Sequence, residues 1–299
     1  MRGAPPSPGP PAGFGGQRVS AGRTPYGTEK HQEIPHVSPT AADRAATLHL
    51  TGERTVPDVP EENYWFRRHE AAYEALVPYC RDAVVLEAGC GEGYGAALIA
   101  GHAHRVLALD YDGVTTEHAA HRYPDVDVAL ADLSTLPVAT GGVDVVATLQ
   151  VLEHLRDQEG FLAECRRVLR PGGRLLVTTP NRLTFTPDSP TPLNPFHTRE
   201  LAPSELDALL HDTGFVVESP RGLYHGAGAA ELDRRYGGSV IDAQLDVVLG
   251  ALPGQAVWPE PLLSDIAALT AADFDLHDGD PREGELDACL DLVAVAARP

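Results

Sequence analysis

The sequence predicts an α/β protein with a mostly parallel sheet that is covered by helices on both faces. From about residue 49 onward, short apolar runs of strand length alternate with stretches of helical length. The first strand, 84–88, runs straight into a turn with glycines at 89, 91 and 93, and then into a helix. The second strand stops at Asp110, about 20 residues beyond the first glycine, where such sheets place a carboxylate under ribose hydroxyls. We therefore expect a nucleoside-containing cofactor at this edge of the sheet.

The other elements follow in order along the chain. Strands are expected at 84–88, 105–109, 126–130, 143–149, 174–179, 214–219 and 289–297. Helices are expected through Ala71 to Leu76 and near 94–101, 113–121, 158–169 and 203–212. The run Pro171-Gly172-Gly173 ends one of these helices, because proline and paired glycines cannot continue it.

Three regions differ in composition. Residues 1–48 are rich in Pro, Gly, Ser and Ala without a helical or strand period, which predicts a disordered tail. The catalytic core is expected at 49–221 and 286–299. Residues 222–285 form an insertion with helical stretches around 239–250 and 260–272. The insertion is expected to be a lid or an acceptor-binding wall, with a structural cap or a dimer contact as an equal alternative.

The spacing of the glycines indicates which cofactor binds. Gly89-x-Gly91-x-Gly93 departs from the dinucleotide pattern G-x-G-x-x-G. Glu87 and Glu92 would place negative charge beside a pyrophosphate, which is unfavourable, but would suit the ammonium and sulfonium groups of S-adenosyl-L-methionine. Residues 86–93 resemble the first motif of the class I S-adenosylmethionine-dependent methyltransferases. The resemblance implies a Rossmann-like seven-stranded sheet of order 3-2-1-4-5-7-6, with the helical insertion before the last strand.

Cofactor-binding residues follow from strand ends and from this resemblance. They are predicted to be Glu87, Gly89, Gly91, Gly93, Asp110, Tyr111, Asp132, Leu133 and Gln150. Asp132 leaves the third strand where it would read the adenine, with the backbone of its neighbour assisting. A lone aspartate in a loop is more often a turn former. Gln150 opens a segment, 150–155, that is similar to the V-L-E-H-L signature of the family and would lie over the methionine part of the cofactor.

Two histidines are the predicted catalytic residues. An alcohol has a pKa far above neutrality, so methyl transfer to oxygen benefits from a base that takes the proton. His197, in a loop that two prolines fix, is the first candidate and His154 the second; His154 could instead pack the following helix. No metal is predicted, because the acidic loop with His277, Asp278, Asp280 and Glu283 is typical of a solvated segment.

A narrower resemblance covers residues 49–299. The segments 52–57, 62–69, 194–201 and 237–244 look like those of the mycofactocin oligosaccharide methyltransferases. This resemblance implies methyl transfer to a glucose hydroxyl of an oligosaccharide acceptor. Tyr224, Tyr236 and Trp258 in the insertion are candidate sugar-facing rings, with buried support as an equal alternative for each. Arg68 could close over the cofactor carboxylate. Alternatives are transfer to another small-molecule or glycolipid hydroxyl, an NAD-linked oxidoreductase, or a cofactor-binding protein without catalysis.

Composition limits the partners. The formal net charge of -20 would repel nucleic acid and anionic membranes, so neither is expected as a partner. The four cysteines form no C-x-x-C pair, no long apolar run is present, and no secretory signal is recognised. These features predict a cytoplasmic location, while the oligomeric state is left open.

Overall fold

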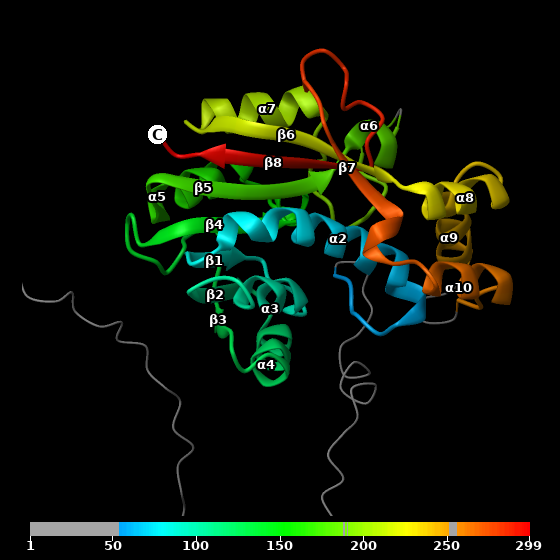
Figure 1. Cartoon of the computed structure of the whole chain (residues 1–299), viewed down its shortest axis with the longest axis horizontal. Coiled ribbons are helices and arrows are strands. Elements are labelled where there is room, and N and C mark those ends of the chain that lie inside the picture. Colours follow the sequence, from blue (N-terminus) through cyan, green and yellow to red (C-terminus); the bar gives the residue numbers. More distant parts are fainter. Residues whose placement is uncertain (1–53, 188, 190, 251–255) are drawn as a thin grey trace, which may run out of the picture. The chain divides into compact units, whose positions relative to one another are not determined.

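The computed structural model describes residues 54–187, 189, 191–250 and 256–299, so the predicted tail 1–48 lies outside the described residues. Its central feature is a mixed sheet of eight strands in the order β3-β2-β1-β4-β5-β8-β6-β7 (Figure 1). The strands are β1 (Val84–Ala88), β2 (Arg105–Asp110), β3 (Asp127–Leu130), β4 (Val143–Leu149), β5 (Leu169–Pro180), β6 (Val216–His225), β7 (Phe274–Asp278) and β8 (Asp291–Ala297). The first five are parallel, and β8 runs antiparallel between β5 and β6.

The predicted strand order is confirmed, and β7 is an addition to it. Strand β8 takes the place of the seventh strand of the expected pattern, and β7 pairs with β6 at the edge of the sheet. Strand β6 continues to His225, so the expected boundary at 222 falls inside a strand. The insertion therefore begins after β6 and carries a strand as well as helices.

Helices cover both faces of the sheet because successive side chains of a strand point to opposite sides. Val85 and Val106 join one apolar core with α2 and α3, whereas Leu86 and Val146 join another with α5 and α7. The helices of the core are α2 (Asn63–Leu76), α3 (Tyr94–Ala100), α4 (Gly113–Arg122), α5 (Gln158–Val168), α6 (Arg182–Phe185) and α7 (Pro203–Asp212). Short 3-10 helices are η1 (Pro60–Glu62), η2 (Val77–Cys80), η3 (Leu152–His154) and η4 (Ala271–Asp273).

Helix α5 ends at Val168, one residue before the expected end at 169, and the strand that follows begins earlier than expected, at Leu169. Leu169 pairs with Val143, and the next pair joins Arg174 to Val145. The four intervening residues, which include the proline and both glycines, lie within β5 and interrupt its regular pairing with β4.

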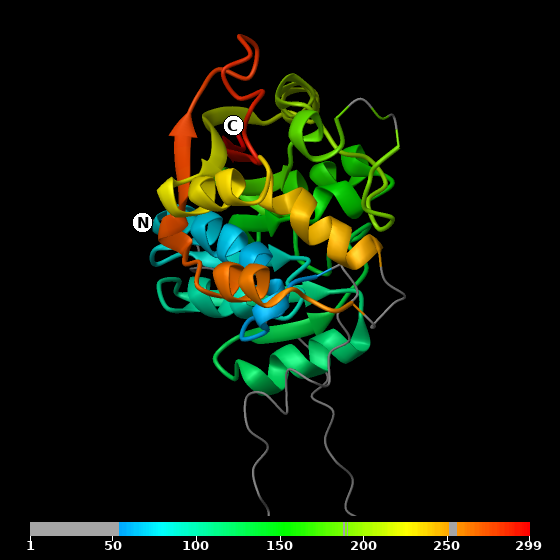
Figure 2. The same ribbon diagram turned by 90° about the vertical axis from the view of Figure 1, so that its right-hand side faces the viewer.

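The insertion contributes α8 (Ala227–Arg235), α9 (Val240–Leu249) and α10 (Glu260–Ala267). These three helices lie beyond the carboxyl end of β5 (Figure 1). In Figure 2, which views the molecule from that side, they stand in front of the sheet. Their apolar side chains join the core on the α2 side. Among the described residues, no helix combines the length and the apolar character that a membrane span requires.

Candidate active site

The glycine turn after β1 has a conformation that other residues rarely adopt. Gly89, Gly91 and Gly93 have φ of 84°, 52° and 100°. A Cβ at Gly89 would lie 2.5 Å from Cγ2 of Val151, so the turn and the segment after β4 touch without room for a side chain. The pattern of glycines thus serves close packing at the carboxyl edge of the sheet.

The backbone N–H groups of this turn are already bonded inside the protein. Gly89 and Cys90 both donate to the carbonyl of Leu109, at 2.8 and 2.9 Å. Gly91 donates to Oδ2 of Asp110 at 2.9 Å. An anion-binding loop needs such groups aimed at the ligand. The turn is therefore poorly suited to a pyrophosphate, in agreement with the reading of the glycine spacing.

The two acidic residues of the turn are in different states. Glu87 is fully buried; its Oε1 accepts from the Tyr73 hydroxyl at 2.6 Å, and its Oε2 has no partner. Burial, more than any neighbour, raises the pKa of Glu87 to about 8. Glu92 instead pairs with His118 at 2.8 Å and Arg122 at 3.2 Å. Of the two, Glu87 is the one with a buried carboxyl oxygen that has no partner.

A cavity opens at the carboxyl ends of β1, β2 and β4. Its wall consists of Arg54, Thr55, His69, Tyr73, Gly89, Cys90, Gly91, Glu92, Tyr94, Asp110, Tyr111, Leu133, Leu149, Gln150, Val151, His154 and Leu155. Six of the nine predicted cofactor residues are in this wall, namely Gly89, Gly91, Asp110, Tyr111, Leu133 and Gln150. Glu87 lies behind it through Tyr73, and Gly93 and Asp132 are outside the wall.

Asp132 forms a turn in this structure. Its carboxylate is exposed, and Oδ1 accepts from the N–H of Ser134 at 2.8 Å. That hydrogen bond lowers the pKa of Asp132. Leu133 rather than Asp132 reaches the cavity, so contact of the Asp132 side chain with an adenine stays a prediction.

Gln150 carries backbone strain at the centre of the wall. Its φ is +57°, which is uncommon for a residue other than glycine. Its N–H donates to the carbonyl of Thr178 at 3.0 Å, and its Nε2 donates to the hydroxyl of Thr178 at 3.2 Å. Strand β5 thus holds Gln150 in place against the cavity.

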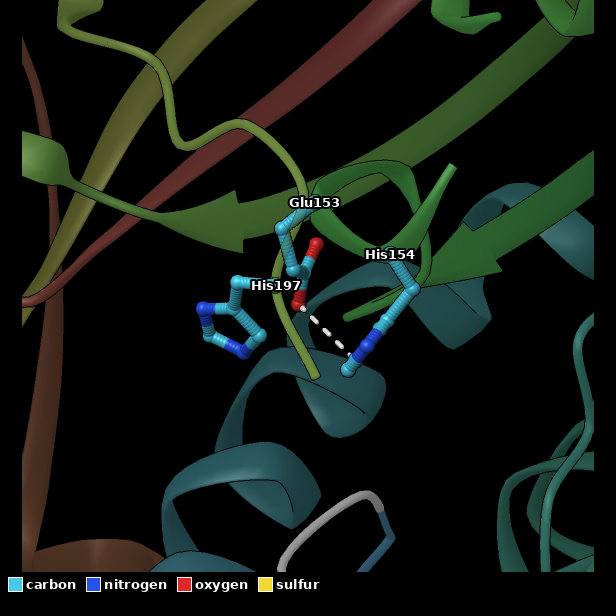
Figure 3. Close-up of side chains that lie close together, drawn as sticks. All are labelled: Glu153, His154 and His197. Atoms are coloured by element: carbon cyan, nitrogen blue, oxygen red, sulfur yellow. Dashed lines mark ion pairs between the residues drawn. The ribbon is translucent and has the colours of Figure 1, made fainter. Parts of the chain in front are cut away.

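The two predicted catalytic histidines lie next to each other (Figure 3). Their ring centroids are 4.9 Å apart and the rings are nearly perpendicular. His154 is in the cavity wall, whereas His197 is not. Nδ1 of His197 lies 2.7 Å from Oε1 of Glu200, and its Nε2 lies 3.1 Å from the amide nitrogen of Asn194. Of the two candidates, His154 is thus the one that borders the cavity, and the choice of base stays a prediction.

Glu153 connects the histidines to the sheet and to the loop before α7. Its Oε2 accepts from the hydroxyl of Thr179 at 2.9 Å. Its carbonyl accepts from the N–H groups of Thr198 at 2.7 Å and Arg199 at 3.3 Å. Burial raises the pKa of Glu153 to about 7. Glu153 thus helps to position both histidines. It is bonded to His154 in the chain, and its carbonyl holds the residues that directly follow His197.

An aromatic wall flanks the histidines. The ring of Phe185 lies 5.5 Å from that of His197, and Trp65 lies 6.3 Å from Phe185. The three rings named from the insertion have other contacts: Tyr224 donates to the carbonyl of Glu285, Tyr236 donates to Asp265, and Trp258 packs against the core. None of those three is in the cavity wall.

Arg68 is not among the residues that line the cavity. Its Nε and Nη2 bind the two carboxylate oxygens of Asp291 at 2.6 and 2.5 Å, and both side chains are buried. The contact ties α2 to the start of β8. Arg68 is thus used for packing, and the expected closure over a cofactor carboxylate has no support here.

Several residues of the site were given no role in the sequence analysis. His69 lines the cavity, and burial lowers its pKa to about 4, so its ring is neutral. Tyr73 reaches Glu87, and Glu200 orients His197. Of these residues, Glu200 was the one that the sequence could have indicated, because it follows His197 by three residues within the segment 194–201.

These observations fit S-adenosyl-L-methionine. A buried carboxylate oxygen without a partner, Oε2 of Glu87, lies behind the cavity, and a neutral His69 and an exposed Tyr111 ring line it. The carboxylate suits an ammonium or sulfonium group, and the ring suits a nucleobase.

Comparison with known proteins gives the same result. Residues 86–177 match the family model described as a methyltransferase domain. A probable S-adenosylmethionine-dependent methyltransferase of Mycolicibacterium smegmatis is 55% identical over 254 residues, which are 85% of this chain and 96% of the relative. One of Mycobacterium tuberculosis is 51% identical over 279 residues, 89% of this chain and 98% of the relative.

Solved structures share the fold. A structure described as a SAM-dependent methyltransferase of Thermotoga maritima, possibly a histamine N-methyltransferase, has a TM-score of 0.50 and 18% identity. The alignment covers 79% of this chain and 93% of that one. The [4+2]-cyclase SpnF has a TM-score of 0.51 and 19% identity, with 77% and 81% covered. These two likenesses concern the fold alone.

Proposed function

Because the chain belongs to the S-adenosylmethionine-dependent methyltransferases, we propose that it methylates a hydroxyl oxygen of a sugar, a glucose of the mycofactocin oligosaccharide. S-adenosyl-L-methionine is its cofactor. The observation that carries the choice of oxygen is the cluster of Glu153, His154 and His197, of which His154 lines the cavity. An alcohol must lose its proton as it is methylated, and a group at this place can assist.

The chain's own residues hold the cofactor in this proposal. When bound, the cofactor supplies a methyl group on a positively charged sulfur. Gly89 and Gly91 let the backbone approach it, Asp110 and Tyr111 hold its nucleoside end, and Gln150 covers its amino-acid end. Glu87 stabilises the positive charge from behind the wall through its free Oε2.

The acceptor docks on the other side of His154. The half-buried rings of Trp65 and Phe185 lie beside His197, and aromatic rings are common contacts of carbohydrates. A neutral sugar needs no basic groove, which agrees with a net charge of -20. Docking there brings the acceptor oxygen near the methyl group, and such positioning supplies much of the acceleration in a transfer reaction.

Methylation of another small-molecule or glycolipid hydroxyl is the alternative. It would use the same cavity and the same histidines, and it differs only in what lies against Trp65 and Phe185. The NAD-linked oxidoreductase is not retained, because the N–H groups of Gly89, Cys90 and Gly91 are bonded within the protein and not aimed at a pyrophosphate.

The test is mass spectrometry of glycans and lipids from cells with and without this protein. We expect the mycofactocin glycans to lack one methyl group when the protein is absent, and purified protein with S-adenosyl-L-methionine to restore it. Unchanged glycans, or a methyl group missing from a lipid instead, would contradict the sugar assignment. A variant of Trp65 that fails to restore the methyl group, while still binding S-adenosylhomocysteine in calorimetry, would support the acceptor wall.

A further inference from the structure

Three metal-binding side chains converge beside the cofactor cavity. Glu153 and His154 belong to η3, directly after β4, and His197 comes from the loop before α7. One ligand atom of each lies within 4.8 Å of the others (Figure 3). Oε1 of Glu153 and Nε2 of His154 are 3.9 Å apart. Two imidazole nitrogens and one carboxylate oxygen are a donor set for divalent transition metals, with open positions for other ligands.

Outer hydrogen bonds orient these donors as they do around bound metals. Nδ1 of His154 lies 3.1 Å from the carbonyl oxygen of Phe196 and donates to it, and Nε2 is the ring nitrogen that lies toward Glu153. Nδ1 of His197 donates to Glu200 at 2.7 Å, which forms a carboxylate–histidine pair. The hydroxyl of Thr179 holds the second oxygen of Glu153 and leaves Oε1 toward the histidines.

The charge at the cluster also favours a cation. The carboxylates of Glu153 and Glu200 are both buried, with 1% of each side chain exposed. In the part of the chain that the structure describes, each makes its ion pair with a histidine and neither with an arginine. The nearby Arg68 is committed to Asp291. Burying a carboxylate away from water has an energetic cost, and a divalent ion bound between these side chains would offset it.

We propose that Glu153, His154 and His197 bind a divalent transition-metal ion beside the cofactor cavity. The amide nitrogen of Asn194, 3.1 Å from Nε2 of His197, occupies the position that the ion would take on that ring. Binding of the ion therefore displaces this one contact and keeps the bonds to Nδ1.

The ion would have a chemical role that rests on the proposed function. A metal lowers the pKa of an oxygen that it binds, so a sugar hydroxyl placed there would lose its proton near neutral pH. In the transfer, the acceptor oxygen forms a bond to the methyl carbon, the carbon–sulfur bond breaks with its electron pair left on sulfur, and the hydroxyl proton leaves to water. His154 and His197 then act as ligands instead of bases.

Cobalt(II) titration of the untagged full-length chain, freed of metal by a chelator, tests the site without an acceptor. We expect saturable visible absorption of the bound ion, with a dissociation constant that His154→Ala, His197→Ala and Glu153→Gln each raise by about 100-fold or more. Glu200→Gln should raise it about 10- to 100-fold, as for partners of a ligating histidine. His277→Ala, an exposed histidine elsewhere, is the matched control and should bind as the natural chain does.

Two results separate this inference from the proposed function. Absence of saturable cobalt absorption in the natural chain, or binding unchanged in both histidine variants, would overturn the metal site whatever the acceptor is. Circular dichroism and calorimetry with S-adenosylhomocysteine verify folding, and His197→Ala should bind that product normally because His197 is outside the cavity wall. Methyl transfer at full rate in the metal-free chain would overturn the role of the ion at the acceptor.

Discussion

Replacing Glu87 by Gln should stabilise the protein at alkaline pH. The carboxyl group is fully buried, accepts one hydrogen bond and has an oxygen with no partner. Its pKa rises from 4.5 to about 8 in the folded chain because burial disfavours the charge. Between these two values the folded state binds more protons than the unfolded state. The free energy of unfolding that Glu87 contributes therefore falls as the pH rises from about 4.5 to about 8, and it changes little above that range.

The size follows from the two pKa values. Between pH 5 and pH 8, the natural chain should lose about 3–4 kcal/mol of unfolding free energy through Glu87, at about 1.4 kcal/mol per pKa unit. Gln cannot ionise, so the variant avoids this loss. In a chain of this size, the difference in melting temperature between variant and natural chain should grow by roughly 7–14 °C from pH 5 to pH 8.

The assay is differential scanning calorimetry across that pH range, with Glu74→Gln as the control because Glu74 is an exposed carboxylate on α2. An identical difference in melting temperature at pH 5 and pH 8 would refute the reasoning about burial. Calorimetric titration with S-adenosylhomocysteine completes the test. The variant should bind more weakly than the natural chain at pH 8, and the natural chain should bind more tightly at pH 8 than at pH 6, since an ionised Glu87 attracts the product's ammonium group.

Three other changes have expected outcomes. Gly89→Ala should cost about 1–3 kcal/mol for its positive φ alone, with more from the contact with Val151, and calorimetry should show weaker binding of S-adenosylhomocysteine; a normal melting temperature would argue against the tight turn. Arg68→Met should lower the free energy of unfolding in urea by about 3–5 kcal/mol, because Asp291 is left buried and unpaired, and adding Asp291→Asn should recover part of the loss. The four buried cysteines should react slowly with a thiol reagent in the native chain and rapidly in urea, because burial raises the pKa of each thiol; fast native labelling would contradict this.

The sequence predicts the central sheet well because its strands are buried on both faces. Such strands are continuous apolar runs with sharp ends, and β1 and β4 have the predicted bounds. Helix α7 also has its predicted bounds, since Pro203 begins it and apolar residues repeat at helical spacing. The edge strand β7 was missed because most of its side chains are exposed and its pairing with β6 depends on residues some fifty positions earlier along the chain.

The site was predictable where neighbours in the sequence are neighbours in space. Gly89, Gly91 and Asp110 could be placed because a strand, a turn and the end of the next strand always meet at this edge. The partners of Glu153 could not, because Thr179 and Thr198 come from β5 and from a separate loop. The burial of Arg68 likewise depends on Asp291, more than two hundred residues away in the chain. Contacts of that range leave no periodic signal.

The carbonyl of Glu153 accepts two N–H groups from the segment 194–201, so a single peptide unit joins the segment after β4, which lines the cavity, to the segment in which we propose that the acceptor docks. Exchange of that segment between related enzymes, by evolution or in the laboratory, must therefore keep Thr198 in register. A graft that respects this anchor can alter which compound is modified without disturbing how the donor is held, whereas a one-residue shift would impair both at once.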